Sequence, residues 1–212
     1  MRTKILLTVV IFIAAIYSSN AQINIDRYLI GGSINYYNTT NPTTVGFYSN
    51  LQIGKVIKDN SVIGLTGSYS SNNYNYTVAS PNKTRSYTSG IFYRKYTSLA
   101  KKFYFFGELD ASYSYSRNIQ QNYNGGQYYN SKSSGVAVSF IPGISYNVWK
   151  RLQMELSIPS LASLSYSHIS TIDSSLPSSV SPQKRDSYAV GINLNSNIIS
   201  NFAIGFKFLL GK

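Results

Sequence analysis

The stretch KKFYFFGELDASYSYS, residues 101–116, alternates two kinds of side chain. Every second residue from Phe103 to Tyr115 is apolar, aromatic or small, whereas the residues between them include Glu108 and Asp110. Because successive side chains of a β-strand point to opposite faces, this pattern predicts a strand with one apolar and one polar face. The deciding question is which of these faces meets water.

Similar alternation recurs along the chain and predicts eight strands, at residues 28–38, 45–57, 61–71, 86–96, 103–116, 134–147, 152–166 and 188–210. The last segment is long enough for two strands, but its apolar residues keep one phase, which favours a single strand and an even total. Nine or ten strands is the alternative. The expected connections are short at one end (58–60, 97–102, 148–151) and mostly longer at the other (39–44, 72–85, 117–133, 167–187). This asymmetry is typical of outer-membrane barrels.

Charges within the strands fall opposite the apolar phase, at Arg94, Glu108, Asp110, Glu155 and Lys207. Soluble barrels such as lipocalins alternate too, but their apolar face points inward. Tyrosine favours the headgroup level of a membrane, and aromatic residues recur at the expected strand ends (Tyr36, Tyr69, Phe103, Tyr113, Tyr115, Tyr146). The predicted fold is therefore an all-β, eight-stranded antiparallel up-and-down transmembrane β-barrel.

The N-terminal residues read as an export signal. Arg2 and Lys4 precede an apolar run at 5–17, and small residues stand at Ser19 and Ala21. We therefore expect a signal peptide at residues 1–21 and a barrel domain at 22–212, with a retained anchor helix as the alternative. Removing two of the 19 basic residues and none of the seven acidic ones lowers the formal charge from +12 to +10. Such a basic exported chain is expected to meet anionic lipid or lipopolysaccharide rather than nucleic acid.

An eight-stranded barrel has an interior that side chains can fill. Unpaired charge in so narrow a space is costly, so we expect the lumen charges to pair. The predicted lumen network has two clusters, Glu155 with Lys207 and Arg94 with Glu108 or Asp110. If the barrel base is level, Leu152 faces Leu210 and Glu155 comes opposite Lys207. The alternative is an open or switchable path for ions.

Three stretches, KKFYFFGELDASYSYS, FIPGISYNVWKRLQMELSI and the ending FAIGFKFLLGK, resemble the small outer-membrane β-barrel proteins common in Bacteroidota. These proteins are broadly similar to OmpA- and OmpX-type barrels, and the resemblance covers residues 28–212. It implies an eight-stranded outer-membrane barrel with no assigned chemistry, inserted by the barrel-insertion machinery through its C-terminal strand. Such barrels usually end on an aromatic residue, whereas Phe208 is followed here by Leu-Leu-Gly-Lys.

The single histidine is the one candidate for general-base chemistry. His168-Ile169-Ser170 resembles the His-x-Ser pair of outer-membrane lipid A deacylases, and Asp173 would orient the imidazole. If the strand alternation survives Pro159, His168 and Ser170 both face outward. A loop histidine without catalytic work is the simpler interpretation. With one histidine, no cysteine and no clustered carboxylates, we expect neither a metal site nor a cofactor.

The expected long loops are rich in Tyr, Asn and Gly, a composition suited to surface contacts. Basic residues in or beside these loops could meet lipopolysaccharide phosphates: Lys83, Arg85, Arg117, Lys132, Lys184 and Arg185. Taken together, the sequence predicts a non-enzymatic, porin-like surface barrel with a plugged lumen, acting as a structural element or as a binding platform for an unspecified extracellular ligand. A narrow pore and a lipid A-modifying hydrolase are the alternatives.

Overall fold

The computed structural model describes residues 23, 25–40, 43–75, 81–121, 128–158, 160–173, 182–192 and 203–211. The expected signal peptide and the expected mature start at Gln22 lie outside these residues. Within the described residues, no helix has the length and apolar character needed to cross a membrane.

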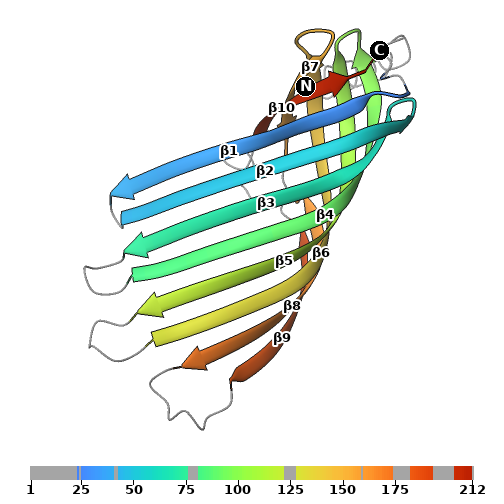
Figure 1. The fold of residues 1–212 in the computed structure, drawn as a ribbon. Coiled ribbons are helices and arrows are strands. Elements are labelled where there is room, and N and C mark those ends of the chain that lie inside the picture. The colour runs from blue at the N-terminus through green and yellow to red at the C-terminus, as the bar shows by residue number, and fades with distance from the viewer. Residues whose placement is uncertain are drawn as a thin grey trace, which may run out of the picture.

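The described chain consists of antiparallel strands joined by hairpins (Figure 1). They are β1 (Tyr28–Thr40), β2 (Thr43–Lys58), β3 (Ser61–Asn75), β4 (Pro81–Ala100), β5 (Phe103–Gln121), β6 (Tyr128–Asn147), β7 (Leu152–Ser157), β8 (Ala162–Asp173), β9 (Gln183–Ile192) and β10 (Ala203–Leu210). We call the end that carries the short connections at 59–60 and 101–102 the turn end, and the opposite end the loop end.

A ring of eight strands closes the barrel. Strands β1 to β6 pair in sequence order, β6 pairs with β7, β7 with β10, and β10 with β1. Beyond the interruption at 158–161, β8 continues along β6 in place of β7 and pairs with β9. The prediction of an eight-stranded antiparallel barrel is therefore confirmed, although its last two strands are each described in two parts.

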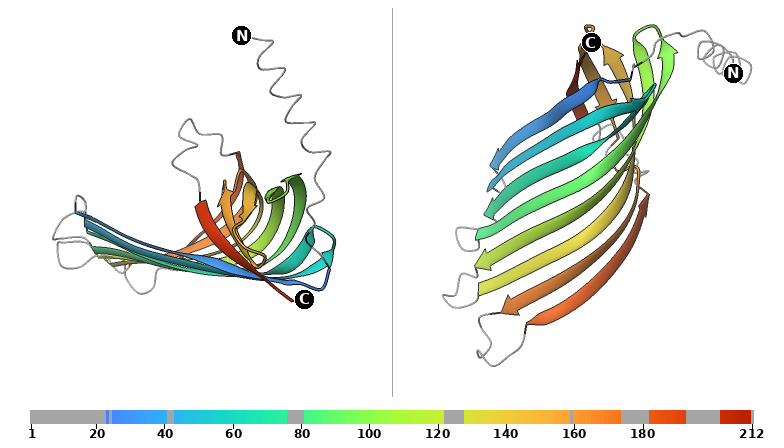
Figure 2. Two further views of the ribbon diagram at one scale, coloured as in Figure 1. Left: turned by 90° about the horizontal axis from the view of Figure 1, so that it is seen from above. Right: turned by 45° about the vertical axis from the view of Figure 1, so that its right-hand side comes forward.

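The loop end is wider than the turn end. Among the described residues, the part of β1 beyond Gly32 pairs only with β2, and β9 pairs only with β8. Figure 2 shows the strands curving tightly around β7 and β10 and running out as a broad curved sheet away from them. The lumen is thus enclosed mainly at the turn end.

Several strands extend further toward the loop end than the sequence predicts. Within the expected loop at 117–133, β5 continues to Gln121 and β6 begins at Tyr128. Within the expected loop at 167–187, β8 continues to Asp173 and β9 begins at Gln183. The added residues are mostly polar on both faces, so they lack the apolar alternation that reveals a strand. Their backbone groups are nonetheless satisfied by pairing with the neighbouring strands.

The outward face carries the large apolar side chains. On β5, Leu109 is 53% exposed and lies midway between Phe103 and Tyr115, both of which are also exposed. The ring centroids of Phe103 and Tyr146 lie 4.6 Å apart near the turn end, and those of Tyr69 and Tyr87 lie 5.2 Å apart nearer the loop end. Two aromatic levels therefore bound the outward apolar surface.

The inward face is apolar at the turn end, which the sequence analysis did not anticipate. Phe92, Tyr96, Tyr104 and Phe106 share the inward phase of Glu108 and are buried with other apolar residues (Ile23, Leu29, Val56, Val62, Leu209). Ile23 is held there by Asn60, whose backbone N–H donates to the Ile23 carbonyl at 3.0 Å. The Ile23 N–H in turn donates to Asn60 Oδ1 at 2.8 Å. We call these nine buried side chains the apolar layer.

Candidate functional site

A buried ionic layer adjoins the apolar layer and lies on the loop side of most of it, with Glu108 one pleat beyond Phe106 and Phe92 alone lying one pleat beyond Arg94. Arg94, on β4, is 3% exposed, and it contacts Glu108 of β5 and Glu155 of β7, which are 1% and 5% exposed. Arg94 Nη2 lies 2.7 Å from Glu108 Oε2, and Arg94 Nη1 lies 2.6 Å from Glu155 Oε1. One guanidinium thus bridges two carboxylates from different sides of the lumen.

The strand pattern explains why these groups meet. Arg94 and Glu108 stand directly opposite each other in the β4–β5 hairpin, and both occupy inward positions. Glu155 comes from β7, which is not a neighbour of β4 in the ring, so its contact with Arg94 crosses the lumen. Because guanidinium carries five N–H donors in a planar fork, a single arginine can serve both carboxylates.

Lys207 and Gln52 complete the layer. Lys207 Nζ donates a hydrogen bond to Gln52 Oε1, and Gln52 Nε2 donates to Glu108 Oε1 at 3.0 Å. The expectation that Glu155 would pair with Lys207 is wrong. Strand β10 is offset by two residues from the level base assumed above, so Phe208 faces Leu152 and Lys207 faces Gln153.

Aromatic side chains of the apolar layer support the arginine. The guanidinium carbon of Arg94 lies 4.3 Å from the ring centroid of Phe106, within range for a cation–π contact. Arg94 Nη1 also donates to the Tyr96 hydroxyl at 3.0 Å, and that hydroxyl donates to Glu155 Oε1 at 3.3 Å. The ionic and apolar layers therefore form one continuous packed unit.

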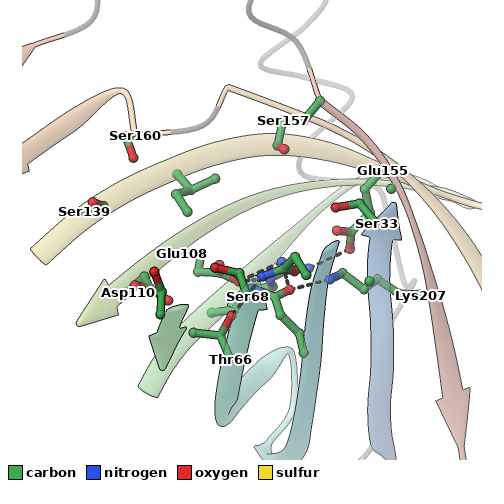
Figure 3. Close-up of a pocket in the computed structure, with 18 of the residues that line it drawn as sticks. Ser33, Thr66, Ser68, Glu108, Asp110, Ser139, Glu155, Ser157, Ser160 and Lys207 are labelled. Carbon is green, nitrogen blue, oxygen red and sulfur yellow. Dashed lines mark hydrogen bonds and ion pairs between the residues drawn. The ribbon is translucent and has the colours of Figure 1, made fainter. Parts of the chain in front are cut away.

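A polar cavity of about 460 Å³ opens on the loop side of the ionic layer (Figure 3). Hydroxyl and amide side chains line its walls (Ser33, Asn50, Thr66, Ser68, Thr88, Ser112, Ser139, Ser157), while Arg94, Glu108, Glu155 and Lys207 contribute to its floor. Asp110 also lines the cavity and bonds to the Ser112 side chain. In the described residues Asp110 forms no ion pair, so of the two expected partners of Arg94 only Glu108 meets it.

The outward-facing histidine has an aspartate partner other than the one expected. His168 Nδ1 lies 2.7 Å from Asp186 Oδ1, and the Tyr166 hydroxyl donates to the same oxygen at 3.0 Å. Asp186 stands opposite His168 in the β8–β9 ladder, whereas Asp173 ends β8 five residues further on. Asp186, and not the predicted Asp173, therefore contacts the imidazole.

The strand alternation resumes beyond residues 158–161. Tyr166, His168 and Ser170 share the outward phase of Leu164, which is exposed. Ser170 thus lies on the same face as His168, one pleat further toward the loop end. The sequence could not single out Asp186, because it lies in the stretch expected to be a loop.

The six predicted basic residues divide between two faces. Arg85, Arg117, Lys132 and Lys184 are exposed and belong to one row of opposed positions on the outward face, and Lys83 lies one pleat beyond Arg85. Arg185 is exposed too, but it alternates with Lys184 and so belongs to the inward phase of β9. In the described part of the chain, no three metal-ligating residues gather.

Comparisons with known proteins return structural matches alone. No family model matches the chain, and no curated protein sequence does so. A major outer membrane protein from Thermus thermophilus is similar at TM-score 0.47 and 9% identity, over 89% of this chain and 100% of that one. Neisserial surface protein A is similar at TM-score 0.40 and 15% identity, over 89% of this chain and 99% of that one.

Proposed function

We propose that this protein is a non-enzymatic barrel of the bacterial outer membrane that does not conduct and serves as a structural or binding platform. Its outward face supports the membrane placement. Twelve residues separate Phe103 from Tyr115 on β5, which is about 40 Å along a strand and about 30 Å in height at a typical barrel tilt. This height suits a hydrocarbon core of about 30 Å.

The closed lumen rests on one observation, the bridge from Arg94 to both Glu108 and Glu155 across the barrel. A conducting path would have to pass this bridge and the apolar layer beneath it. Every partner of the guanidinium is itself buried, so opening the path would expose or strand charge, at a cost of several kcal/mol. The cavity on the loop side of the bridge is then a polar pocket, closed at its floor, that small polar molecules enter from the loop side.

The absence of cysteine allows a direct test of this arrangement. The variant Ser112→Cys places a thiol in the polar pocket, and the variant Tyr104→Cys places one in the apolar layer. With the refolded variants in liposomes, a charged methanethiosulfonate reagent added on the loop side should label Ser112→Cys rapidly and Tyr104→Cys hardly at all. Added on the turn side, it should label neither. Equal labelling of Ser112→Cys from both sides would contradict a closed lumen.

A second candidate function is hydrolysis of an acyl ester in the outer leaflet, favoured by the 2.7 Å contact between His168 and Asp186. An aspartate on Nδ1 leaves Nε2 free to act as a base, the arrangement used to activate a serine. Ser170 on the same face would be the nucleophile. The test compares lipid A acylation in strains that produce the wild type or Ser170→Ala. Identical acylation in the two strains would rule out the hydrolase.

Membership of the Bacteroidota barrel family and insertion through the C-terminal strand remain part of the proposal. They are supported by the alternation of side chains along β10, because Phe206 and Phe208 both point outward and are exposed. Insertion assays comparing the wild type with Phe208→Ala would test this part. Unchanged insertion rates would count against the C-terminal signal.

A further inference from the structure

We infer that the outward wall binds the phosphate groups of outer-leaflet lipid headgroups through a basic row. The basic row consists of Arg85, Arg117, Lys132, Ser170 and Lys184. This inference relies on the proposed membrane placement but is independent of whether the lumen conducts. The row joins five neighbouring strands, β4, β5, β6, β8 and β9, so no single loop creates it.

Strand register places these five residues in one row across the strands. Arg85 stands opposite Arg117, Arg117 opposite Lys132, Lys132 opposite Ser170, and Ser170 opposite Lys184. Directly opposed residues have Cβ atoms about 5 Å apart. The row therefore holds three adjacent cations, a hydroxyl, and a fourth cation.

The charges of the basic row have no internal compensation. Like charges directly opposite each other on neighbouring strands are destabilising. In the described residues none of the four cations forms an ion pair, and Arg117 Nε donates instead to the amide oxygen of Asn130 at 3.1 Å. The nearest carboxylate along the row's edge, Asp186, bonds to His168. An external anion would relieve this repulsion.

The height of Arg85 and Arg117 points to a lipid. Arg85 and Arg117 lie one pleat beyond Tyr87 and Tyr115, which face each other at the aromatic level near the loop end. Tyrosine rings of a barrel sit at the headgroup level, so groups about 5 Å higher meet the headgroup phosphates. The acyl chains of the same lipid would lie along the apolar wall below.

The side chains of the row suit phosphate in two ways. Arg85 and Arg117 present planar forks that bind phosphate oxygens in pairs. Lys132 and Lys184 flank Ser170 across two strand spacings, about 10 Å, and so can hold one phosphate between two ammonium groups and a hydroxyl. The best occupant is accordingly a lipid with more than one phosphate, such as a doubly phosphorylated glycolipid.

The test compares the refolded full-length barrel with two triple variants in neutral detergent micelles. Arg85→Gln, Arg117→Gln and Lys132→Gln together remove three charges from the row. Lys58→Gln, Lys101→Gln and Lys150→Gln together remove three exposed charges at the turn end and serve as the matched control. Binding of doubly phosphorylated lipid A, and of the same lipid after phosphatase treatment, is measured by titration.

The row variant should bind phosphorylated lipid A about 100-fold more weakly than the wild type, and the control should change less than about threefold. The dephosphorylated lipid should bind all three proteins equally weakly. Equal losses in both variants would show an effect of net charge alone and overturn the inference, as would unchanged binding by the row variant. If the triple variant does not refold, Arg117→Gln with Lys132→Gln against Lys58→Gln with Lys101→Gln gives the same contrast. Failure of the wild type to enter liposomes would instead refute the membrane placement.

Discussion

Arg94 Nη1 lies 2.6 Å from Glu155 Oε1, although 61 residues separate the two and their strands are not neighbours in the ring. The contact ties β4 to β7 across the lumen, where no backbone ladder joins them. It therefore fixes the cross-section of the barrel at the level of the ionic layer.

Replacing Arg94 by alanine should destabilise the barrel strongly. The change leaves Glu108 and Glu155 buried without a cation, and breaking a buried ion pair in this way costs about 3–5 kcal/mol. Urea unfolding from lipid vesicles measures the loss. The control Arg185→Ala removes an exposed arginine and should change the free energy of unfolding by less than about 0.5 kcal/mol. Similar losses in both variants would contradict the bridging role.

Gly143 on β6 should not tolerate a side chain. A Cβ at this position would lie 2.4 Å from Phe106 Cζ and 2.7 Å from the Leu156 carbonyl oxygen. Gly143→Ala should therefore cost about 1–3 kcal/mol by overpacking the apolar layer. At Gly205 a Cβ would meet nothing within 4 Å, so Gly205→Ala is the matched control and should be neutral or stabilising. An equally stable Gly143→Ala barrel would mean that the layer is loosely packed.

Arginine substitutions on the outward face test the membrane placement. Leu109 lies midway between the aromatic levels, so Leu109→Arg should cost about 2–4 kcal/mol in vesicles. Tyr115→Arg, at the headgroup level, should cost only about 0–1 kcal/mol for the charge. The free energy of unfolding in vesicles measures both. If the two changes cost the same, the outward face at Leu109 does not meet hydrocarbon.

Asn60 should matter through both its backbone and its side chain. Its φ of 62° is unfavourable for most residues, and its Oδ1 accepts the Ile23 N–H. Asn60→Ala loses both advantages and should destabilise by about 1–2 kcal/mol. Asn60→Gly keeps the backbone freedom and should lose only the hydrogen bond, about 1 kcal/mol. Equal losses would assign the whole effect to the hydrogen bond with Ile23.

Much of this architecture follows from alternation alone. The phase of residues 103–116 separates outward Leu109 from inward Glu108. In the β4–β5 hairpin, the short turn and the bulge between Ser98 and Ala100 together set Arg94 opposite Glu108. Both are local relations, because each depends on one strand or one hairpin. The count of eight strands follows from the single phase of the last segment.

The remaining relations depend on closure of the ring. The contact of Arg94 with Glu155 spans the lumen, and the two-residue offset of β10 against β7 separates Lys207 from Glu155. Neither the offset of β10 against β7 nor the cross-section of the barrel can be predicted from the sequence of a single strand. The partner of His168 escaped prediction for a different reason, since Asp186 lies where both faces of β9 are polar and no alternation marks a strand.

The apolar layer illustrates a limit of the charge argument. Mid-strand charges identify the inward face correctly at Glu108, but Phe106 and Tyr104 of the same phase are apolar and fill the turn end. Such residues fit a small barrel whose interior is packed by side chains. Closure by a packed layer, rather than by ion pairs alone, is therefore the more complete description of the lumen.

Single-channel recording of the refolded wild type in a planar bilayer, beside Glu155→Ala, tests the closed lumen most directly. The bridge between Arg94 and Glu155, with the apolar layer beneath it, predicts a silent wild type at all holding potentials that the bilayer tolerates. Steady conductance steps in the wild type that change in size or ion selectivity with Glu155→Ala would contradict the closed lumen. They would show instead that these charges line an open path.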